Sequence, residues 1–208
     1  MYTPKDDIDS TSISVFQCPS DGATALGTNY RVCMGPDAQP RAEDGGGRGP
    51  FVSYAEARTN IPRGLSNVVS FAERLRSNSS NSYFQSQRDI WFAGLASNSS
   101  SDVYLTASEL AVRHPPKFFY RSCGHSWYSQ LAVFTAYNHL AGPNSGGTAL
   151  VQNPWGGSVV EGLGYVIPST SNHSAGVNVA RCDGSVSLVA DGIDVLVWRA
   201  LGTAIDGS

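Results

Sequence analysis

Charged side chains are scarce in this sequence. Asp, Glu, Lys and Arg together make up 15% of its 208 residues, and the formal net charge is -3 with a pI near 5.7. Proteins that bind nucleic acid normally carry a basic face. The low and slightly acidic charge therefore argues against nucleic acid as a partner, and anionic lipid is disfavoured for the same reason.

Long hydrophobic runs are also missing. No stretch approaches the ~18 consecutive apolar residues of a membrane-spanning helix, and the opening Met-Tyr-Thr-Pro-Lys-Asp-Asp has none of the apolar core of a signal peptide. We therefore expect that the 208 residues of this sequence do not themselves contact a membrane.

The spacing motifs of common metal and hydrolase sites do not occur. There is no Cys-x2-Cys, His-x-His or His-x3-His pattern, so a transition-metal site is not expected. Ser126 follows His125 outside the Gly-x-Ser-x-Gly context of a hydrolase nucleophile. A hydrolase site assembled in space from His125, His139 and Glu73 stays open as a weaker alternative.

Glycine, by contrast, is abundant, with 22 residues, and Ser/Asn tracts interrupt the middle of the chain. With few charges, this composition indicates a loop-rich β protein, and 208 residues supply enough chain for a proper core. We predict one domain over residues 1–208, of α+β class, mostly antiparallel β with long loops and a few short helices. The expected strands lie near residues 12–17, 28–34, 66–75 and 127–137, and the expected helices near 105–113 and 195–201.

The last quarter of the chain carries its most informative run. His173 stands nine residues ahead of the pair Asp183-Gly184, and apolar-rich segments flank that pair. Asp-Gly is a hairpin signal, because a type I′ turn needs positive φ at both central residues. At ~3.3 Å per extended residue, His173 and Asp183 are roughly 30 Å apart and do not share a site. Asp183 is predicted to be the turn residue and His173 a hydrogen-bonded structural group.

This run resembles the bacterial H-X9-DG family (DUF1559), a domain of unknown function found behind prepilin-type processing signals. The resemblance extends in order over almost all of the chain. It implies a pseudopilin-like globular head without the N-terminal apolar helix that anchors such proteins in the membrane and forms the filament core. The other segments that carry it are Cys18-Pro19-Ser20-Asp21, Thr28-Asn29-Tyr30, Gly64-Leu65-Ser66-Asn67, Phe71-Ala72-Glu73-Arg74-Leu75, Tyr137-Asn138-His139, Pro143-Asn144 and Val197 to Thr203.

The extracytoplasmic location that the resemblance implies makes disulfides the favoured state of the four cysteines. Cys18 and Cys33 flank a turn-rich stretch between two strand-like runs, which suits a local disulfide worth about 3 kcal/mol. Cys123 and Cys182 are then expected to pair, for about 4 kcal/mol. Four buried free thiols are the alternative.

Glu73 and Arg74 are adjacent on a predicted strand, where neighbouring side chains point to opposite faces. They therefore do not form a catalytic constellation by themselves. Pairing of the buried Glu or Arg with another segment is the favoured interpretation, because a buried charge demands a partner.

No cofactor is expected, with calcium as the one open possibility. Pseudopilins often hold calcium in an acidic loop, and two acidic loops occur here, although the EF-hand pattern is absent. Solvated loops, with Asp194 capping the last helix, are the favoured interpretation. The acidic residues concerned are Asp37, Glu43 and Asp44 in one loop and Asp191 and Asp194 around the other.

We therefore expect a non-enzymatic module of the periplasm or cell surface with a structural or assembly role in a type II secretion or pilus-like system. Its expected partners are other pseudopilin or secretion-system components, and the isolated chain is expected to be monomeric. The alternative is a carbohydrate-binding or adhesive domain with polysaccharide as partner. That alternative depends on exposed aromatics, of which Trp155 is the first candidate, although core packing explains most of the others.

Overall fold

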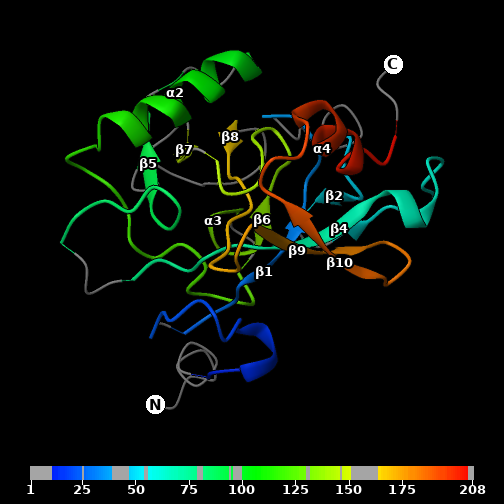
Figure 1. Cartoon of the computed structure of the whole chain (residues 1–208), viewed down its shortest axis with the longest axis horizontal. Helices are drawn as coiled ribbons and strands as arrows, with labels where there is room; N and C mark the ends of the chain where they lie inside the picture. Colours follow the sequence, from blue (N-terminus) through cyan, green and yellow to red (C-terminus); the bar gives the residue numbers. More distant parts are fainter. Residues whose placement is uncertain are drawn as a thin grey trace, which may run out of the picture.

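A five-stranded sheet forms the centre of the structure, a computed structural model (Figure 1). Its strand order is β10-β9-β4-β1-β6, and neighbouring strands are antiparallel except β1 and β6, which are parallel. The strands are β1 (Tyr30–Cys33), β4 (Val69–Glu73), β6 (Ala136–Tyr137), β9 (Gly176–Arg181) and β10 (Val186–Ala190). The structure describes residues 11–24, 26–38, 47–53, 56–78, 82–93, 95, 100–129, 132–145, 147–150 and 164–205.

One face of this sheet is packed into the main apolar core. Val177 and Val179 of β9 are buried, and β10 places the buried Val189 opposite Val177. Because side chains alternate along a strand, these residues share a face. The same core contains Trp198 from the last helix, α4 (Val195–Leu201), so α4 packs against this core.

A second, smaller layer lies under helix α2, at the upper left of Figure 1. The helix presents Tyr104, Ala107, Ser108 and Ala111 inward, which is the spacing of one helical face. It ends before Pro115, since proline restricts the preceding residue and cannot continue a helix. The elements of this layer are β5 (Ile90–Phe92), α2 (Ser101–Arg113), β7 (Thr148–Leu150) and β8 (Tyr165–Val166).

The α+β class is confirmed, and α4 has the predicted bounds. Two expected strands are wrong. Residues 12–17 contain the 3-10 turn η1 (Ser14–Phe16), and residues 127–137 contain the short helix α3 (Ala132–Thr135) before β6. Short apolar runs do not distinguish strand from helix by periodicity, which explains both errors. The remaining elements are β2 (Phe51–Ser53), β3 (Glu56–Ala57) and the 3-10 turn η2 (Leu65–Asn67).

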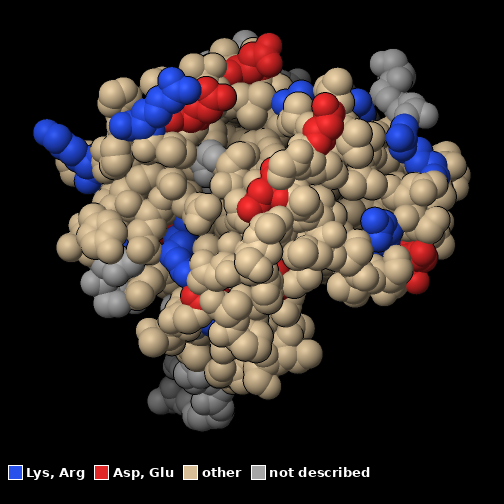
Figure 2. Space-filling model, in the orientation of Figure 1, with Lys and Arg blue, Asp and Glu red and all other residues tan. Residues whose placement is uncertain are grey.

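The described surface carries few charges. Figure 2 shows one face on which Lys, Arg, Asp and Glu side chains are scattered rather than gathered in a basic patch. None of the helices in the described part of the chain combines the length and the apolar character that crossing a membrane requires.

The β9–β10 hairpin turns at the predicted place but with another geometry. The C=O of Arg181 accepts from the N–H of Gly184 at 3.0 Å, and the C=O of Ser185 accepts from the N–H of Arg181 at 2.8 Å. Only Gly184 of the Asp-Gly pair has positive φ, +85°, whereas a type I′ turn requires it at both residues. The loop is therefore a three-residue turn with a glycine bulge. Asp183 stabilises it by accepting from the N–H of Ser185 at 2.9 Å.

We predict that Gly184→Ala lowers the free energy of unfolding by about 1–2 kcal/mol, the cost of a side chain in the left-handed region. Gly192→Ala is the matched control, because Gly192 is also exposed and open to a Cβ but lacks the positive φ. The control should stay within about 0.5 kcal/mol of wild type. Thermal melts compare the two, and equal stabilities would contradict the turn assignment.

Candidate functional site

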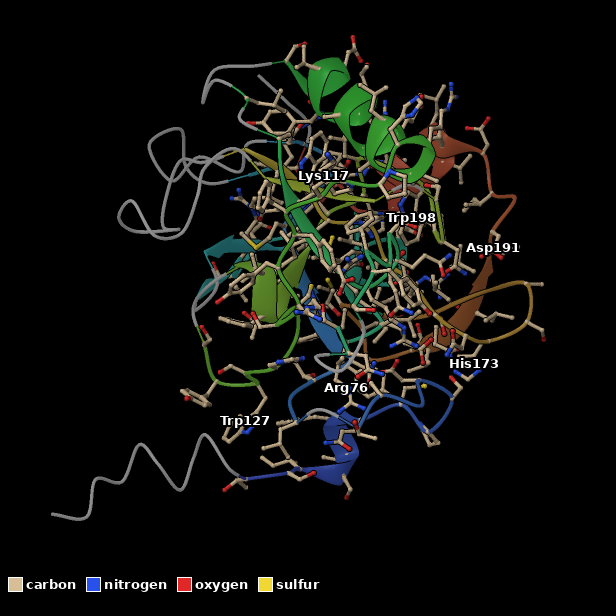
Figure 3. All side chains as sticks on the ribbon, turned by 90° about the vertical axis from the view of Figure 1, so that its left-hand side faces the viewer. Arg76, Lys117, Trp127, His173, Asp191 and Trp198 are labelled. Atoms are coloured by element: carbon tan, nitrogen blue, oxygen red, sulfur yellow. The ribbon has the colours of Figure 1, made fainter. Side chains whose placement is uncertain are left out.

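Segments far apart in the sequence meet at the end of strand β4. The loop after η1 brings Cys18 and Ser20, and β4 ends with Glu73. The loop before β9 brings His173, which Figure 3 shows beside the blue loop that follows η1. All three segments carry the family resemblance. Together, Cys18, Ser20, Glu73 and His173 form what we call the His173 cluster.

The contacts of this cluster converge on one atom, Nε2 of His173. Oε1 of Glu73 lies 3.2 Å from Nε2, and Sγ of Cys18 lies 3.4 Å from it. Oγ of Ser20 lies 3.4 Å from Nε2 and 3.0 Å from Sγ of Cys18. The ligand-type atoms of Cys18, Glu73 and His173 all lie within 4.8 Å of one another. Thiol, imidazole and carboxylate are the side chains that bind transition metals.

Glu73 is buried, and its neighbours keep it ionised. Burial by itself raises the pKa of the carboxyl, but hydrogen bonds from Asn178 and Ser171 and the nearby His173 outweigh it and lower the pKa below the usual value. Oε2 accepts from the N–H of Asn178 at 3.0 Å, and Oε1 accepts from its side-chain amide at 3.1 Å. Strand β9 therefore fixes the carboxylate toward His173.

Asp21 holds the loop that carries Cys18. Its buried carboxylate pairs with Arg76, at 2.9 Å, and with Arg88. Burial raises the pKa of Asp21, but hydrogen bonds from Asn29 and Arg76 and the charge of Arg88 lower it overall. The side-chain amide of Asn29 donates to Asp21 at 2.8 Å, and its side-chain oxygen accepts from the N–H of Cys18 at 2.9 Å. Asn29 therefore connects the Asp21 ion pairs to the backbone of Cys18.

The segment of His173 is docked onto the same loop. The side-chain amide of Asn172 donates to the C=O of Ser20 at 2.8 Å and to the C=O of Asp21 at 3.1 Å. The N–H of His173 donates to Oγ of Ser171 at 3.2 Å. These backbone contacts place the imidazole over Cys18 without relying on the cluster contacts themselves.

The predicted disulfides, Cys18–Cys33 and Cys123–Cys182, are not formed, and all four cysteines are free thiols. Cys18 lies in the loop that faces His173, whereas Cys33 points into the core from β1, where burial raises its pKa to about 12. Sequence position along strand-like runs did not reveal that the two thiols have different surroundings.

Cys123 is a partner of buried arginine. Its Sγ accepts from Nη1 of Arg31 at 3.2 Å, and both residues are fully buried. Burial raises the pKa of Cys123, but the charges of Arg31 and Arg74 outweigh it and lower the pKa below the usual value. The thiol therefore helps to compensate buried positive charge, which is a structural role.

The residues of the hydrolase alternative are held by separate partners. His139 stacks on Trp198 with ring centroids 3.6 Å apart, and Nδ1 lies 2.6 Å from the Trp198 C=O. Burial lowers the pKa of His139 to about 3, against the opposing effect of that carbonyl. His125 contacts a backbone carbonyl at 3.0 Å, while Glu73 contacts His173.

The acidic residues considered for calcium have protein partners. Asp37 forms a two-point ion pair with Arg48, at 2.6 and 2.8 Å. Asp191 accepts from the side-chain amide of Asn144 at 2.7 Å, and Asp194 caps α4 as expected. Calcium requires six to eight oxygen ligands. A carboxylate that already accepts from a side chain or caps a helix has fewer oxygens free for it. Glu43, Asp44 and the aromatic Trp155 lie outside the described residues.

A family model described as Protein of unknown function (DUF1559) matches residues 2–196. The chain belongs to this family. The matched range includes every residue of the His173 cluster. No curated protein and no solved structure matches the DUF1559 chain. Its function therefore has to be argued from the geometry.

Sequence reasoning missed the His173 cluster because it compared His173 with Asp183 in the same hairpin and with the other histidines, His125 and His139, rather than with Cys18 and Glu73. The partners come instead from other segments, and 155 positions separate Cys18 from His173. One signal was present, since the Cys-Pro-Ser-Asp, Glu-Arg-Leu and His-x9-Asp-Gly segments all carry the same family resemblance. The absence of closely spaced Cys or His pairs in the sequence does not exclude a site whose ligands come from three separate segments.

We predict that Asp21→Asn lowers the free energy of unfolding by about 3–5 kcal/mol, because it leaves buried guanidinium groups without their carboxylate. Asp37→Asn removes the partly exposed pair with Arg48 and should cost at most about 1 kcal/mol. Urea unfolding measures both. Similar losses in the two variants would show that Asp21 is not the anchor of the loop.

The pH dependence of the fold's stability tests whether the ionised Glu73 stabilises it. Its folded-state pKa is lowered, so it stabilises the fold above its ordinary pKa of 4.5, and this stabilisation is lost as the pH falls below that value. The melting temperature of wild type should therefore fall further than that of Glu73→Gln when the pH is lowered through this range. Asp102→Asn, exposed on α2, is the control and should follow wild type. Parallel acid profiles of wild type and Glu73→Gln would refute this role.

Proposed function

We propose that this DUF1559 chain is a non-enzymatic, extracytoplasmic, pseudopilin-like module with a structural or assembly role in a type II secretion or pilus-like system. The location and the system are supported by the resemblance to proteins behind prepilin-type processing signals. The free thiols remove the disulfide argument for that location. On this proposal the full-length protein is membrane-anchored through an N-terminal helix, and its partners are other pseudopilin or secretion-system components.

The observation that carries the assembly role is an apolar groove on the sheet face opposite the core. Phe71 of β4 is 39% exposed and Leu188 of β10 is 53% exposed. The register places Phe71 beside Ala180, and Ala180 beside Val186, so these side chains share one face. The adjoining groove has a volume of about 470 Å³, and its apolar lining includes Phe51, Ile61, Leu65, Phe71 and Ala180.

Within the described residues, neither longer helix covers this face. α4 packs on the core side and α2 on the second sheet. The β2–β3 ribbon contacts this face through an edge-on pair of Phe51 and Phe71 with centroids 5.5 Å apart, and Ile61 and Leu65 line the groove beside it. In pilin-like folds an amphipathic helix packs its apolar face on the sheet, and exposed apolar patches mark interaction sites. The proposed occupant is therefore the apolar helix of a pilin-type subunit.

The geometry of the His173 cluster supports a non-enzymatic role. In a nucleophile–histidine–acid relay, the nucleophile and the acid contact different ring nitrogens. Here Cys18 and Glu73 both approach Nε2. We therefore expect the chain to be inert toward simple ester, peptide and glycoside substrates, and turnover that His173→Ala abolishes would overturn this part of the proposal.

Capture from a membrane extract of the source bacterium tests the docking face. Wild-type chain should retain proteins that carry prepilin-type leaders, identified by mass spectrometry. The double variant Phe71→Ser/Leu188→Ser should retain less than about one tenth of the prepilin-type protein that wild type retains. The reason is that each apolar side chain buried in the interface contributes about 1.5–3 kcal/mol. Leu196→Ser is the control, since Leu196 is 69% exposed on α4, away from the groove.

Two results would contradict this function. One is the absence of prepilin-type proteins from the captured material. The other is capture that the double variant leaves unchanged. In sedimentation the isolated chain should be monomeric, because the proposed occupant of the face is a helix of another subunit.

Exposed aromatics favour carbohydrate binding as a second candidate. Phe84 and Phe119 pack edge-on with centroids 5.5 Å apart, and each is next in sequence to an exposed aromatic, Tyr83 or Phe118. Aromatic faces of this kind stack on sugar rings. A glycan array should then show binding that Phe118→Ala abolishes and Tyr128→Ala, at a separate exposed aromatic, does not. An array without signal for wild type would remove this candidate.

A further inference from the structure

We propose that Cys18, Glu73 and His173 bind one divalent transition-metal ion of the zinc class. The proposal concerns the His173 cluster and is independent of the assembly role. In the described part of the chain, these residues form the one group of three such side chains whose ligand atoms lie close enough to share an ion. The donor set is one thiolate, one imidazole and one carboxylate.

Two of the three separations between ligand atoms match a tetrahedral site. Bonds of about 2.3 Å to sulfur, about 2.0 Å to nitrogen and about 2.0 Å to oxygen place S and N about 3.5 Å apart and N and O about 3.3 Å apart. The corresponding separations here are 3.4 Å for Cys18 and His173 and 3.2 Å for Glu73 and His173. The third pair, Sγ of Cys18 and the Glu73 carboxylate oxygen, lies within 4.8 Å, and binding brings these two atoms to the ~3.5 Å of a tetrahedral site.

Hydrogen bonding alone does not explain this convergence. A ring nitrogen carries at most one proton, which it directs toward one acceptor. Three polar atoms, from Cys18, Ser20 and Glu73, nevertheless lie within 3.4 Å of Nε2. Thiol, carboxylate and hydroxyl atoms this close to one ring nitrogen can share a cation with it as common ligands.

The surroundings hold the ligands in place. Asn178 donates twice to the Glu73 carboxylate, and Asn29 accepts from the N–H of Cys18. Such outer contacts orient metal ligands and tune their affinity. The Glu73 side chain is 4% exposed, but that of His173 is 37% exposed, so an ion can enter from the histidine side.

The site has three strong ligands and room for a fourth. Oγ of Ser20 lies 3.0 Å from Sγ of Cys18 and 3.4 Å from Nε2 of His173, and either this hydroxyl or a water completes the tetrahedron. Thiolate and imidazole favour zinc and its neighbours, whereas calcium and magnesium prefer all-oxygen sites. Because the ligands come from three segments, the bound ion joins them and stabilises the folded state.

Metal titration of the reduced, chelator-treated full chain tests the proposal. Zn²⁺ should bind with one ion per chain and raise the melting temperature, whereas Ca²⁺ should do neither. Co²⁺, used as a spectroscopic probe, should produce the thiolate-to-cobalt charge-transfer band. Cys18→Ser should abolish that band, and both Cys18→Ser and His173→Ala should weaken Zn²⁺ binding by at least ten-fold.

Matched variants separate the site from adventitious binding. Cys182→Ser changes a partly exposed cysteine outside the cluster, and His114→Ala changes an exposed histidine directly after α2. Both should retain wild-type affinity. Circular dichroism establishes that each variant is folded, and His173→Ala decides the matter where Cys18→Ser does not fold, because the His173 side chain is partly exposed.

The proposal is overturned by folded wild type that binds no Zn²⁺, or by a charge-transfer band that persists in Cys18→Ser. Undiminished Zn²⁺ affinity in folded His173→Ala also overturns it, as does equal loss of affinity in the control variants. None of these outcomes depends on the docking face, so failure here leaves the assembly role to its own test.

Discussion

The buried carboxylate of Asp21 is the interaction on which the site depends. An unpaired charge in this position would destabilise the fold by several kcal/mol, so the carboxylate requires its partners. Arg76 follows β4, Arg88 precedes β5, and Asn29 precedes β1, so one side chain joins the start of the chain to three elements. Because Cys18 lies in the same loop, its position opposite His173 follows from this ion-pair network.

Charge in this protein is used inside the fold as well as on its surface. Arg31 and Arg74 are fully buried, and they donate to backbone carbonyls of Val133 and Pro168 at 3.2 and 2.6 Å. Buried guanidinium groups need such partners, and Cys123 supplies another. Part of an already small charge complement is therefore internal, and the exposed face in Figure 2 is correspondingly weakly charged. Such a surface favours apolar and polar contacts over electrostatic attraction, consistent with the proposed docking groove.

Local sequence signals predicted the last helix and the hairpin that follows His173. Asp194 and Gly202 bracket α4 as expected, although Gly202 has an ordinary φ and is required by packing, since a Cβ there would approach the His139 ring to 2.5 Å. The Asp-Gly hairpin was also predictable, but its turn type was not, because the dipeptide is compatible with more than one loop length. Disulfide pairing failed for a related reason, since sequence position does not specify whether a thiol lies in a loop, as Cys18 does, or in the core, as Cys33 does.

The sequence by itself determined the α+β class, the last helix and the hairpin, because their signals lie within a few neighbouring residues. It also carried the family resemblance in separate short segments. Only the tertiary structure decided that Cys18, Glu73 and His173 meet around one point. Their proximity depends on the pairing of β4 with β1 and β9 and on the buried Asp21 network. Contacts of this kind join residues up to 155 positions apart, and no local periodicity encodes them.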